Sequence, residues 1–266
     1  MSSQPIGIFD SGLGGLTVFR EIAKILPQEN LVYLGDTARV PYGTKSAQTV
    51  SRYARQNVEF LLQKNVKMVV VACNTATAFA LDELRSRFFI PIIGVIEPGV
   101  TGALRATKSK RIGVIGTEGT ISSGTYSASV LKRAPAAFVA TAACPLFVPL
   151  VEEGWWQNEI TEIIARTYLN GLLAKKIDTL ILGCTHYPLL KNILSKVAGP
   201  EVTLIDSAEE TARAVAEVLA QKNIMMNSDN SSPYRDYCVT DSPERFRRLG
   251  DLFVGQKIHD VQHVEI

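Results

Sequence analysis

Short apolar runs alternate with longer amphipathic stretches along most of the chain. The runs have the length of buried strands, and the stretches between them carry apolar residues at helical spacing. Alternation of this kind predicts an α/β fold with mostly parallel sheets. The predicted strands are residues 6–10, 31–35, 68–73, 92–96, 111–116, 137–142, 179–183, 202–206 and 237–241. The predicted helices are residues 17–26, 46–64, 75–88, 124–132, 159–174, 188–197 and 208–222, followed by one that Ser242 caps and Pro243 starts.

The alternation repeats along the chain. The segment at residues 6–12 resembles the one at residues 112–118. The number of residues between these two segments is similar to the number between Cys73 and Cys184. This predicts two doubly wound α/β halves with a common plan, although the low identity leaves a chance likeness open. Two points along the chain suggest the domain boundaries: the turn residues after the strand predicted at 92–96, and the end of the strand predicted at 202–206. We expect a first, discontinuous domain of residues 1–97 and 208–266, and a second of residues 98–207.

Composition and charge narrow the class of protein. The 266 residues are 46% hydrophobic and 20% charged, which is typical of a globular protein with an ample core. A formal net charge of +2 gives no overall field that would recruit nucleic acid or an anionic membrane. No stretch approaches the roughly 18 apolar residues of a membrane span, and the start lacks a signal peptide. We therefore expect a cytoplasmic protein with a small-molecule substrate, and a homodimer stays open.

Four cysteines, Cys73, Cys144, Cys184 and Cys238, lie far apart in the sequence. Such spacing is unlike the dense framework of a secreted disulfide scaffold, so we expect reduced thiols. There is no Cys-x-x-Cys motif, and one Cys-x-His pair falls short of the four ligands of a structural zinc site. The sequence therefore predicts no metal site.

Two of these cysteines lie where a predicted strand meets a helix. Cys73 and Cys184 each close an apolar run, and a helix start favours a thiolate, because its free N–H groups and dipole stabilise the anion. Either residue alone is readily explained as a small apolar side chain in the core. The matched pair favours two acid/base groups, whereas Cys144 and Cys238 are interpreted as structural. The polar residues that follow the pair are Asn74, Thr75, Thr185 and His186.

A glycine-rich loop follows the first predicted strand at residues 10–15. It lacks the third glycine of a dinucleotide fingerprint, where Thr17 stands, and it lacks the lysine of a phosphate-binding loop. Backbone contact with a small anion fits it better, with Asp10 and Ser11 left to bind an ammonium or an amide. A tight strand-to-helix turn would explain the same residues.

Two further loops follow predicted strands at the same sheet edge, where open α/β proteins build specificity. One spans residues 35–43, and the other, at residues 117–123, is rich in hydroxyl groups suited to a carboxylate. Both compositions are also typical of ordinary turns. The candidate substrate contacts in these loops are Pro41, Tyr42, Gly43, Thr117 and Thr120.

Glu152 and His186 are the remaining candidates for acid/base chemistry. Glu152 precedes a glycine and two tryptophans, and could orient an imidazole, although an exposed loop acid is the simpler interpretation of its context. His186 lies two residues after Cys184 in a polar turn, where it could act as an acid, a base or an orienting donor.

Taken together, these motifs resemble glutamate racemases of the cofactor-independent aspartate/glutamate racemase superfamily. The resemblance implies two domains related by a pseudo-twofold, with the active site in the cleft between them and no cofactor. It implies catalytic cysteines at Cys73 and Cys184, acting on D- and L-glutamate respectively, and D-glutamate supply for peptidoglycan. The resemblance is carried by residues 8–15, 35–43, 72–76, 116–117, 151–154 and 182–188. Supporting catalytic roles fall on Asp10, Glu152 and His186, and substrate contacts on Asp10, Ser11, Tyr42, Gly43, Asn74, Thr75, Thr185 and His186.

Three other functions stay open on the residues alone. The nearest is racemisation of aspartate or another acidic amino acid. A cysteine hydrolase would use Cys184 with His186, and would leave Cys73 without a role. A two-lobed binding protein would hold its ligand without changing it.

Overall fold

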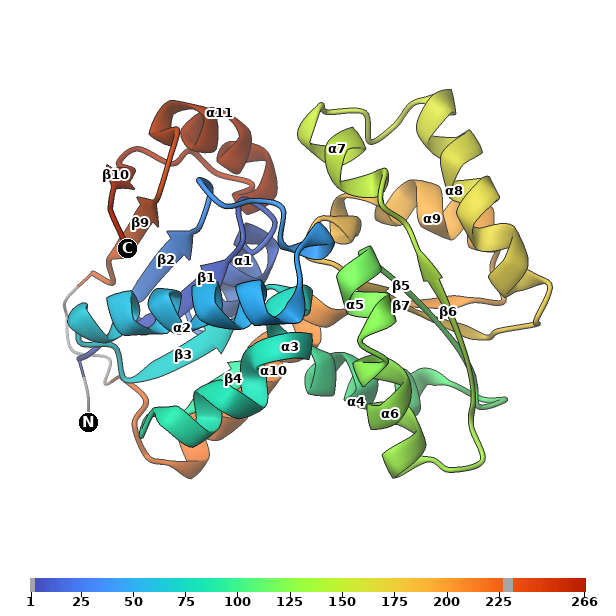
Figure 1. Cartoon of the computed structure of the whole chain (residues 1–266), viewed down its shortest axis with the longest axis horizontal. Coiled ribbons are helices and arrows are strands. Elements are labelled where there is room, and N and C mark those ends of the chain that lie inside the picture. Colours follow the sequence, from blue (N-terminus) through green and yellow to red (C-terminus); the bar gives the residue numbers. More distant parts are fainter. Residues whose placement is uncertain (1–2, 227–231) are drawn as a thin grey trace.

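The computed structural model describes residues 3–226 and 232–266, and within these ranges ten strands form two parallel sheets (Figure 1). The strands of the first sheet are β1 (Ile6–Asp10), β2 (Leu31–Gly35), β3 (Met68–Val71), β4 (Ile92–Gly94), β9 (Arg235–Val239) and β10 (Gln262–His263). Those of the second are β5 (Arg111–Gly116), β6 (Phe138–Ala143), β7 (Thr179–Gly183) and β8 (Thr203–Asp206). The predicted α/β class is confirmed.

The two sheets share one strand order. The first runs β10-β9-β2-β1-β3-β4 and the second β6-β5-β7-β8, with every paired strand parallel. The core of the first sheet, β2-β1-β3-β4, therefore matches the whole of the second, strand for strand. The repeated plan inferred from the sequence is confirmed, and it makes Cys73 after β3 equivalent to Cys184 after β7.

Helices cover both faces of each sheet. The helices around the first sheet are α1 (Leu16–Ile25), α2 (Ala47–Gln63), α3 (Asn74–Arg87), α10 (Ser207–Gln221) and α11 (Pro243–Val254). Those around the second are α4 (Ile96–Ala106), α5 (Glu118–Ser122), α6 (Thr125–Arg133), α7 (Phe147–Glu152), α8 (Glu159–Leu173) and α9 (Lys191–Ala198). Two 3-10 helices are η1 (Tyr42–Thr44) and η2 (Tyr187–Leu190). We call each sheet with its helices the first and the second lobe.

Residues of each strand alternate between two hydrophobic clusters, as the period of two in a strand requires. In β3, Met68 and Val70 face the α1 and α10 side, while Val69 and Val71 face α2 and α3. In the second lobe, Leu180 of β7 faces α8 and α9, while its neighbours on the strand face α4 and α6. One cluster continues from the first lobe into the second, so the lobes share part of their core.

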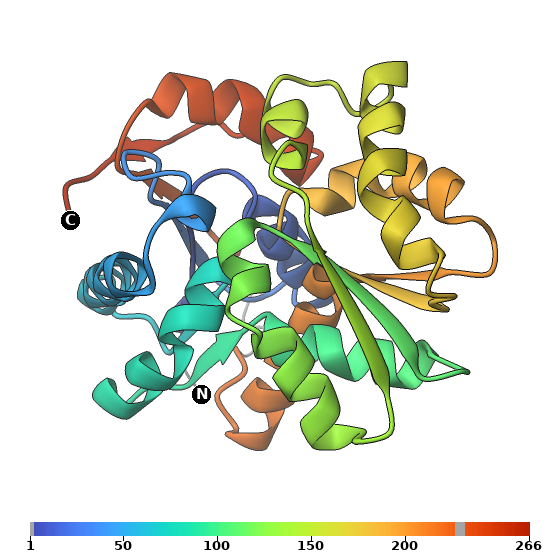
Figure 2. The ribbon, with the colours of Figure 1, turned by 45° about the vertical axis from the view of Figure 1, so that its right-hand side comes forward.

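The chain crosses between the lobes twice. It enters the second lobe through α4 and returns through α10, which packs against both α1 and α4 at the base of the two lobes (Figures 1 and 2). The tail packs on the first lobe, as expected, because β9 pairs with β2 and α11 lies against α1. The domain limits at residues 97/98 and 207/208 stay a prediction. The polar stretch 225–233 lies partly outside the described residues.

The predicted elements match the structure within about two residues at most of their ends. The strand predicted at residues 92–96 ends at Gly94, and the following turn residues form the first turn of α4, a helix that was not predicted. Pro98 is tolerated there because an N–H in the first turn of a helix has no intrahelical partner. The helix predicted at residues 188–197 begins instead as η2. The short helices α5 and α7 had no clear pattern in the sequence.

No helix in the described part of the chain is long and apolar enough to cross a membrane. All four cysteines are free and buried.

Gly171 is predicted to lower the stability of the protein, because nothing in its surroundings requires a glycine at this position. It lies exposed in α8, without a positive φ, and a Cβ added there would meet no atom within 4 Å. Gly171→Ala should raise the free energy of unfolding by about 0.5–1 kcal/mol, because alanine loses less backbone entropy in a helix. Gly199→Ala is the matched control, since φ is 82° there and the substitution should cost about 1–3 kcal/mol. Urea unfolding measures both, and a loss of stability in Gly171→Ala would contradict the expectation.

Candidate active site

In each sheet, the connections that follow two neighbouring strands run toward opposite edges of the sheet. It crosses from β1 to β2 on one side and from β3 to β4 on the other, and β5 and β7 repeat this pattern. Such a divergence leaves a crevice at the carboxyl ends of the strands, where open α/β sheets bind ligands. Asp10 and Cys73 lie at this point in the first lobe, and Thr117 and Cys184 lie at it in the second. The topology therefore brings the candidate residues to two equivalent sites.

Asp10, at the end of β1, is fully buried between the lobes. Its Oδ2 accepts the N–H of Gly12 at 3.0 Å, and its Oδ1 accepts the Thr185 hydroxyl of the second lobe at 3.4 Å. Burial raises the pKa of Asp10, and the charge of His186 and these hydrogen bonds offset only part of the rise. Asp10 thus joins the two lobes at the centre of the candidate site.

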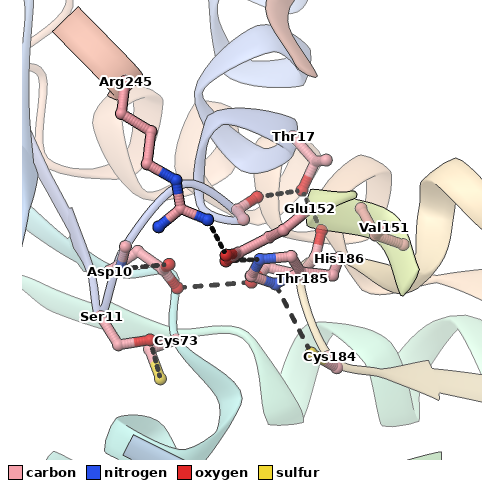
Figure 3. A network of polar contacts seen from close by, with 12 residues as sticks. Asp10, Ser11, Thr17, Cys73, Val151, Glu152, Cys184, Thr185, His186 and Arg245 are labelled. Carbon is pink, nitrogen blue, oxygen red and sulfur yellow. Dashed lines mark hydrogen bonds and ion pairs between the residues drawn. The ribbon is translucent and has the colours of Figure 1, made fainter. Parts of the chain in front are cut away.

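Cys73 is the N-cap of α3, and its sulfur accepts the N–H of Ala76 at 3.4 Å. The thiol lies 3.9 Å from the Ser11 hydroxyl (Figure 3). The helix start was expected to favour the thiolate, but burial and the charge of Asp10 outweigh it and raise the pKa of Cys73 to about 12. At neutral pH, Cys73 is therefore a thiol that can donate a proton.

Cys184 has different neighbours, because the chain that follows it forms the 3-10 helix η2, whereas the α-helix α3 follows Cys73. Its sulfur is 3.9 Å from Nδ1 of His186. Nε2 of His186 lies 3.2 Å from Oε1 of Glu152, and Oε2 of Glu152 lies 3.0 Å from a guanidinium nitrogen of Arg245 on α11. Figure 3 shows Asp10 and Cys73 on the left, with Glu152, His186 and Cys184 to their right.

The contacts along this chain set the protonation of its members. Burial alone would lower the pKa of His186, but the sulfur of Cys184 and the carboxylate of Glu152 raise it to about 10. Burial likewise opposes ionisation of Glu152, yet His186 and Arg245 lower its pKa. Glu152 ends α7 with a side chain only 16% exposed, so it is not an exposed loop acid. His186 is therefore an imidazolium at neutral pH and holds a positive charge beside Cys184.

A hydroxyl cluster joins the lobes next to Cys73. The Thr75 hydroxyl lies 2.9 Å from that of Thr117 and 3.1 Å from that of Thr120, and Thr117 caps α5. Asn74 crosses the same gap, because its Oδ1 accepts the Tyr126 hydroxyl at 2.7 Å. The structure thus brings both predicted threonines of the second lobe to the residues that follow Cys73.

An interlobe cavity of about 320 Å³ is lined by Pro41 and Gly43 on the first-lobe side, and by Thr117 and Glu152 on the other. Tyr42 lies between the first two in the sequence, but its buried side chain turns away from the cavity. The Tyr42 hydroxyl is buried and contacts Asp36, and it accepts a hydrogen bond from Asn57 at 3.1 Å. Any contact of Tyr42 with a substrate must therefore come from its backbone. Gly43 sits directly against Thr117, since a Cβ there would lie 2.6 Å from that of Thr117.

Three residues of the site escaped the sequence reasoning. Arg245 contacts Glu152 from the tail, Tyr126 binds Asn74 from α6, and the Thr17 hydroxyl donates to the carbonyl of Thr185 at 3.0 Å. Each contact joins segments far apart in the sequence, and none belongs to a local motif. Within residues 3–226 and 232–266, no group of three or more His, Cys, Asp or Glu side chains could hold a metal ion.

Comparisons with known proteins all point to racemases of acidic amino acids. The family model described as Asp/Glu/Hydantoin racemase matches residues 6–215. A glutamate racemase from Geobacter metallireducens is 53% identical over the whole chain and 98% of its own length.

Two solved structures have the same fold along nearly the whole chain. The glutamate racemase isoform RacE1 from Bacillus anthracis superposes with a TM-score of 0.95 at 41% identity, covering 99% of this chain and 98% of that one. The glutamate racemase from Francisella tularensis, solved in complex with D-glutamate, gives a TM-score of 0.92 at 38% identity, covering 100% and 98%.

The Tyr42 hydroxyl is predicted to serve stability and not substrate binding. Tyr42→Phe removes the buried hydrogen bonds that the hydroxyl makes with Asp36 Oδ2 and Asn57 Nδ2, which should lower the free energy of unfolding by about 1–3 kcal/mol. The KM for substrate should stay close to that of the wild type, because the side chain does not reach the cavity. A tenfold rise in KM with unchanged stability would show that the hydroxyl binds substrate.

His186 is predicted to make stability depend on pH above neutrality. Its folded pKa, about 10, lies above the ordinary value near 6.5, so its contribution is fully present below pH 6.5 and is lost as pH rises to 10. Between these values the wild type should lose stability more steeply than His186→Gln, by up to about 1.4 kcal/mol per pH unit. Denaturant unfolding of both proteins across this range measures the difference. Parallel curves would refute the raised pKa.

Proposed function

The chain belongs to the Asp/Glu/hydantoin racemase family and is an amino-acid racemase, and we propose that it interconverts L- and D-glutamate with two cysteines and no cofactor. The observation that carries the proposal is the pair of buried cysteines, Cys73 and Cys184, placed after equivalent strands of the two lobes (Figure 3). Glutamate is the substrate named for relatives as similar as 53% identity. The bound D-glutamate of the Francisella enzyme supports the same choice.

Inversion at Cα needs a base on one face and an acid on the other, because a single base tends to return the proton to the side it left. In the proposed reaction from L-glutamate, the Cys184 thiolate takes the Cα proton and becomes a thiol. The electron pair left on Cα then takes the proton of the Cys73 thiol from the opposite face. The product is D-glutamate, and Cys73 remains as a thiolate that can start the reverse reaction.

The protonation states in the site support this direction. Cys73 keeps its proton because its pKa is raised to about 12, so it is ready to act as the acid. His186 holds a positive charge 3.9 Å from the sulfur of Cys184, the residue that we assign as the base. Glu152 and Arg245 act through His186, so we assign them as positioning residues.

The hardest part of the reaction is the negative charge that develops on the α-carbon and α-carboxylate. Preorganised donors in a buried site stabilise such charge. We assign this role to the Asn74 amide, the Thr185 backbone N–H and the first N–H groups of α3. Asp10 and Ser11 are assigned to the α-ammonium, by the same proposal.

The remaining predicted contacts are assigned to the substrate side chain. Thr75, Thr117 and Thr120 offer three clustered hydroxyls, and Pro41 and Gly43 border the cavity next to them. Hydroxyls can bind a carboxylate without a fixed charge of their own. The proposed biological role is to supply D-glutamate for peptidoglycan in the cytoplasm.

Each cysteine is predicted to be essential for racemisation. Cys73→Ala and Cys184→Ala should each lower the rate by about 10³-fold or more, because each removes the acid or base on one face of Cα. Circular dichroism of L-glutamate follows the loss of optical activity, and thermal unfolding checks that each variant folds. Cys238→Ala is the matched control, since this buried thiol lies in β9 and should leave turnover close to the wild type.

Deuterated water separates the competing functions. With two bases, deuterium should enter the inverted product early, while the recovered L-glutamate stays unlabelled. Equal labelling of recovered substrate and product would indicate one base and contradict the mechanism. Faster turnover of L-aspartate than L-glutamate would instead reassign the substrate.

A further inference from the structure

Asn74 holds an unpaired donor in the site. Its side chain is buried, with the residue only 3% exposed, and the Oδ1 atom accepts the Tyr126 hydroxyl. Within residues 3–226 and 232–266, the Asn74 Nδ2 atom has no hydrogen-bond partner on the chain. A buried amide nitrogen left unpaired is costly unless a ligand completes it. The free nitrogen therefore marks the place of a substrate acceptor group.

Tyr126 decides which end of this amide is free. An asparagine amide can turn over and exchange its oxygen for its nitrogen, and only its partners fix the choice. Burial raises the pKa of the Tyr126 phenol above its ordinary value, so the hydroxyl keeps the proton that it donates to Oδ1. With Oδ1 held, Nδ2 is the end that remains for the substrate.

The ring of Tyr126 also lies at the other cysteine junction. A Cβ on Gly183, the residue before Cys184, would lie 3.0 Å from the Tyr126 ring. Tyr126 belongs to α6 of the second lobe and Asn74 begins α3 of the first, so their hydrogen bond spans the two lobes. The amide is therefore held in this orientation only while the lobes are together.

We propose that Tyr126 is a positioning residue that holds the Asn74 amide with Nδ2 directed to the substrate carboxylate, and does so only in the closed arrangement of the lobes. The inference rests on the proposed function, in which Asn74 stabilises the charge on the α-carboxylate. Without the Tyr126 hydroxyl, the amide can present its oxygen to the substrate instead, which repels a carboxylate. Tyr126 itself touches no reacting atom.

The equivalent position in the second lobe supports the inference. Thr185 follows Cys184 as Asn74 follows Cys73, and its hydroxyl is bound by Asp10 of the first lobe. Each residue after a cysteine is thus fixed by a partner from the opposite lobe. The arrangement fixes the polar side chain after each cysteine by the same means.

A double-mutant cycle tests the proposal. Tyr126→Phe keeps the ring and removes the hydroxyl, and should lower kcat/KM for glutamate by about tenfold, the effect of one lost hydrogen bond. Asn74→Ala should lower it by about 10²-fold, as the loss of an oxyanion donor does. If Tyr126 acts through Asn74, the double variant should be no slower than Asn74→Ala alone.

Tyr187→Phe is the matched control. Tyr187 is a fully buried tyrosine of the second lobe, and its hydroxyl donates to the Cys144 carbonyl at 2.9 Å. It should lose stability as Tyr126→Phe does, with kcat/KM close to the wild type. An equal loss of kcat/KM in this control, or a full tenfold effect of Tyr126→Phe in the Asn74→Ala background, would overturn the proposal. If Asn74→Ala alone had no effect, the assigned role of Asn74 in the proposed function would fail instead.

Discussion

The site depends on burying several ionisable groups in one small space between two lobes. Asp10, Cys73, Cys184 and His186 are each less than a tenth exposed, and a charge in such surroundings is costly unless it is paired. His186 meets this condition through Cys184 and Glu152, and Asp10 meets it through backbone N–H groups and Thr185. Cys73 has no cation against it, so it stays neutral. In the proposed mechanism, Cys73 is therefore the thiol that donates a proton to Cα.

The scaffold is symmetric, but its electrostatics are not. Matching strand orders place Cys73 and Cys184 at equivalent points, as a reaction with equal and opposite proton transfers requires. Yet Cys73 caps a helix of 14 residues beside Asp10, whereas Cys184 precedes a 3-10 turn beside an imidazolium. A pair of identical thiols would repel each other as two thiolates, or lack a base as two thiols. The unequal surroundings of the two sulfurs suit the proposed two-base mechanism, in which one sulfur gives a proton while the other takes one.

The sequence predicted the features that depend on local pattern. The alternation of apolar residues indicated the strands, and the shared context of Cys73 and Cys184 indicated two equivalent junctions. It failed where distant segments decide the outcome. The pKa of Cys73 rises because burial and the charge of Asp10 outweigh the helix start visible in the sequence. The Tyr42 side chain turns inward because Asp36 and Asn57 bind it, and Arg245 reaches Glu152 only through the packing of α11 on the first lobe.

Four polar contacts between the lobes pass through residues of the site itself. Thr185 binds Asp10, Thr75 binds Thr117, Asn74 binds Tyr126, and Glu152 binds Arg245. Separating the lobes would break all four contacts and would hydrate the charges they hold, which would weaken each electrostatic interaction in the site. Closing the lobes around glutamate would therefore do two things at once, because it removes water and sets the donors and the acid/base groups in place. Release of the product must break the same contacts, so an interaction added between the lobes to strengthen closure would slow turnover once opening became the slowest step.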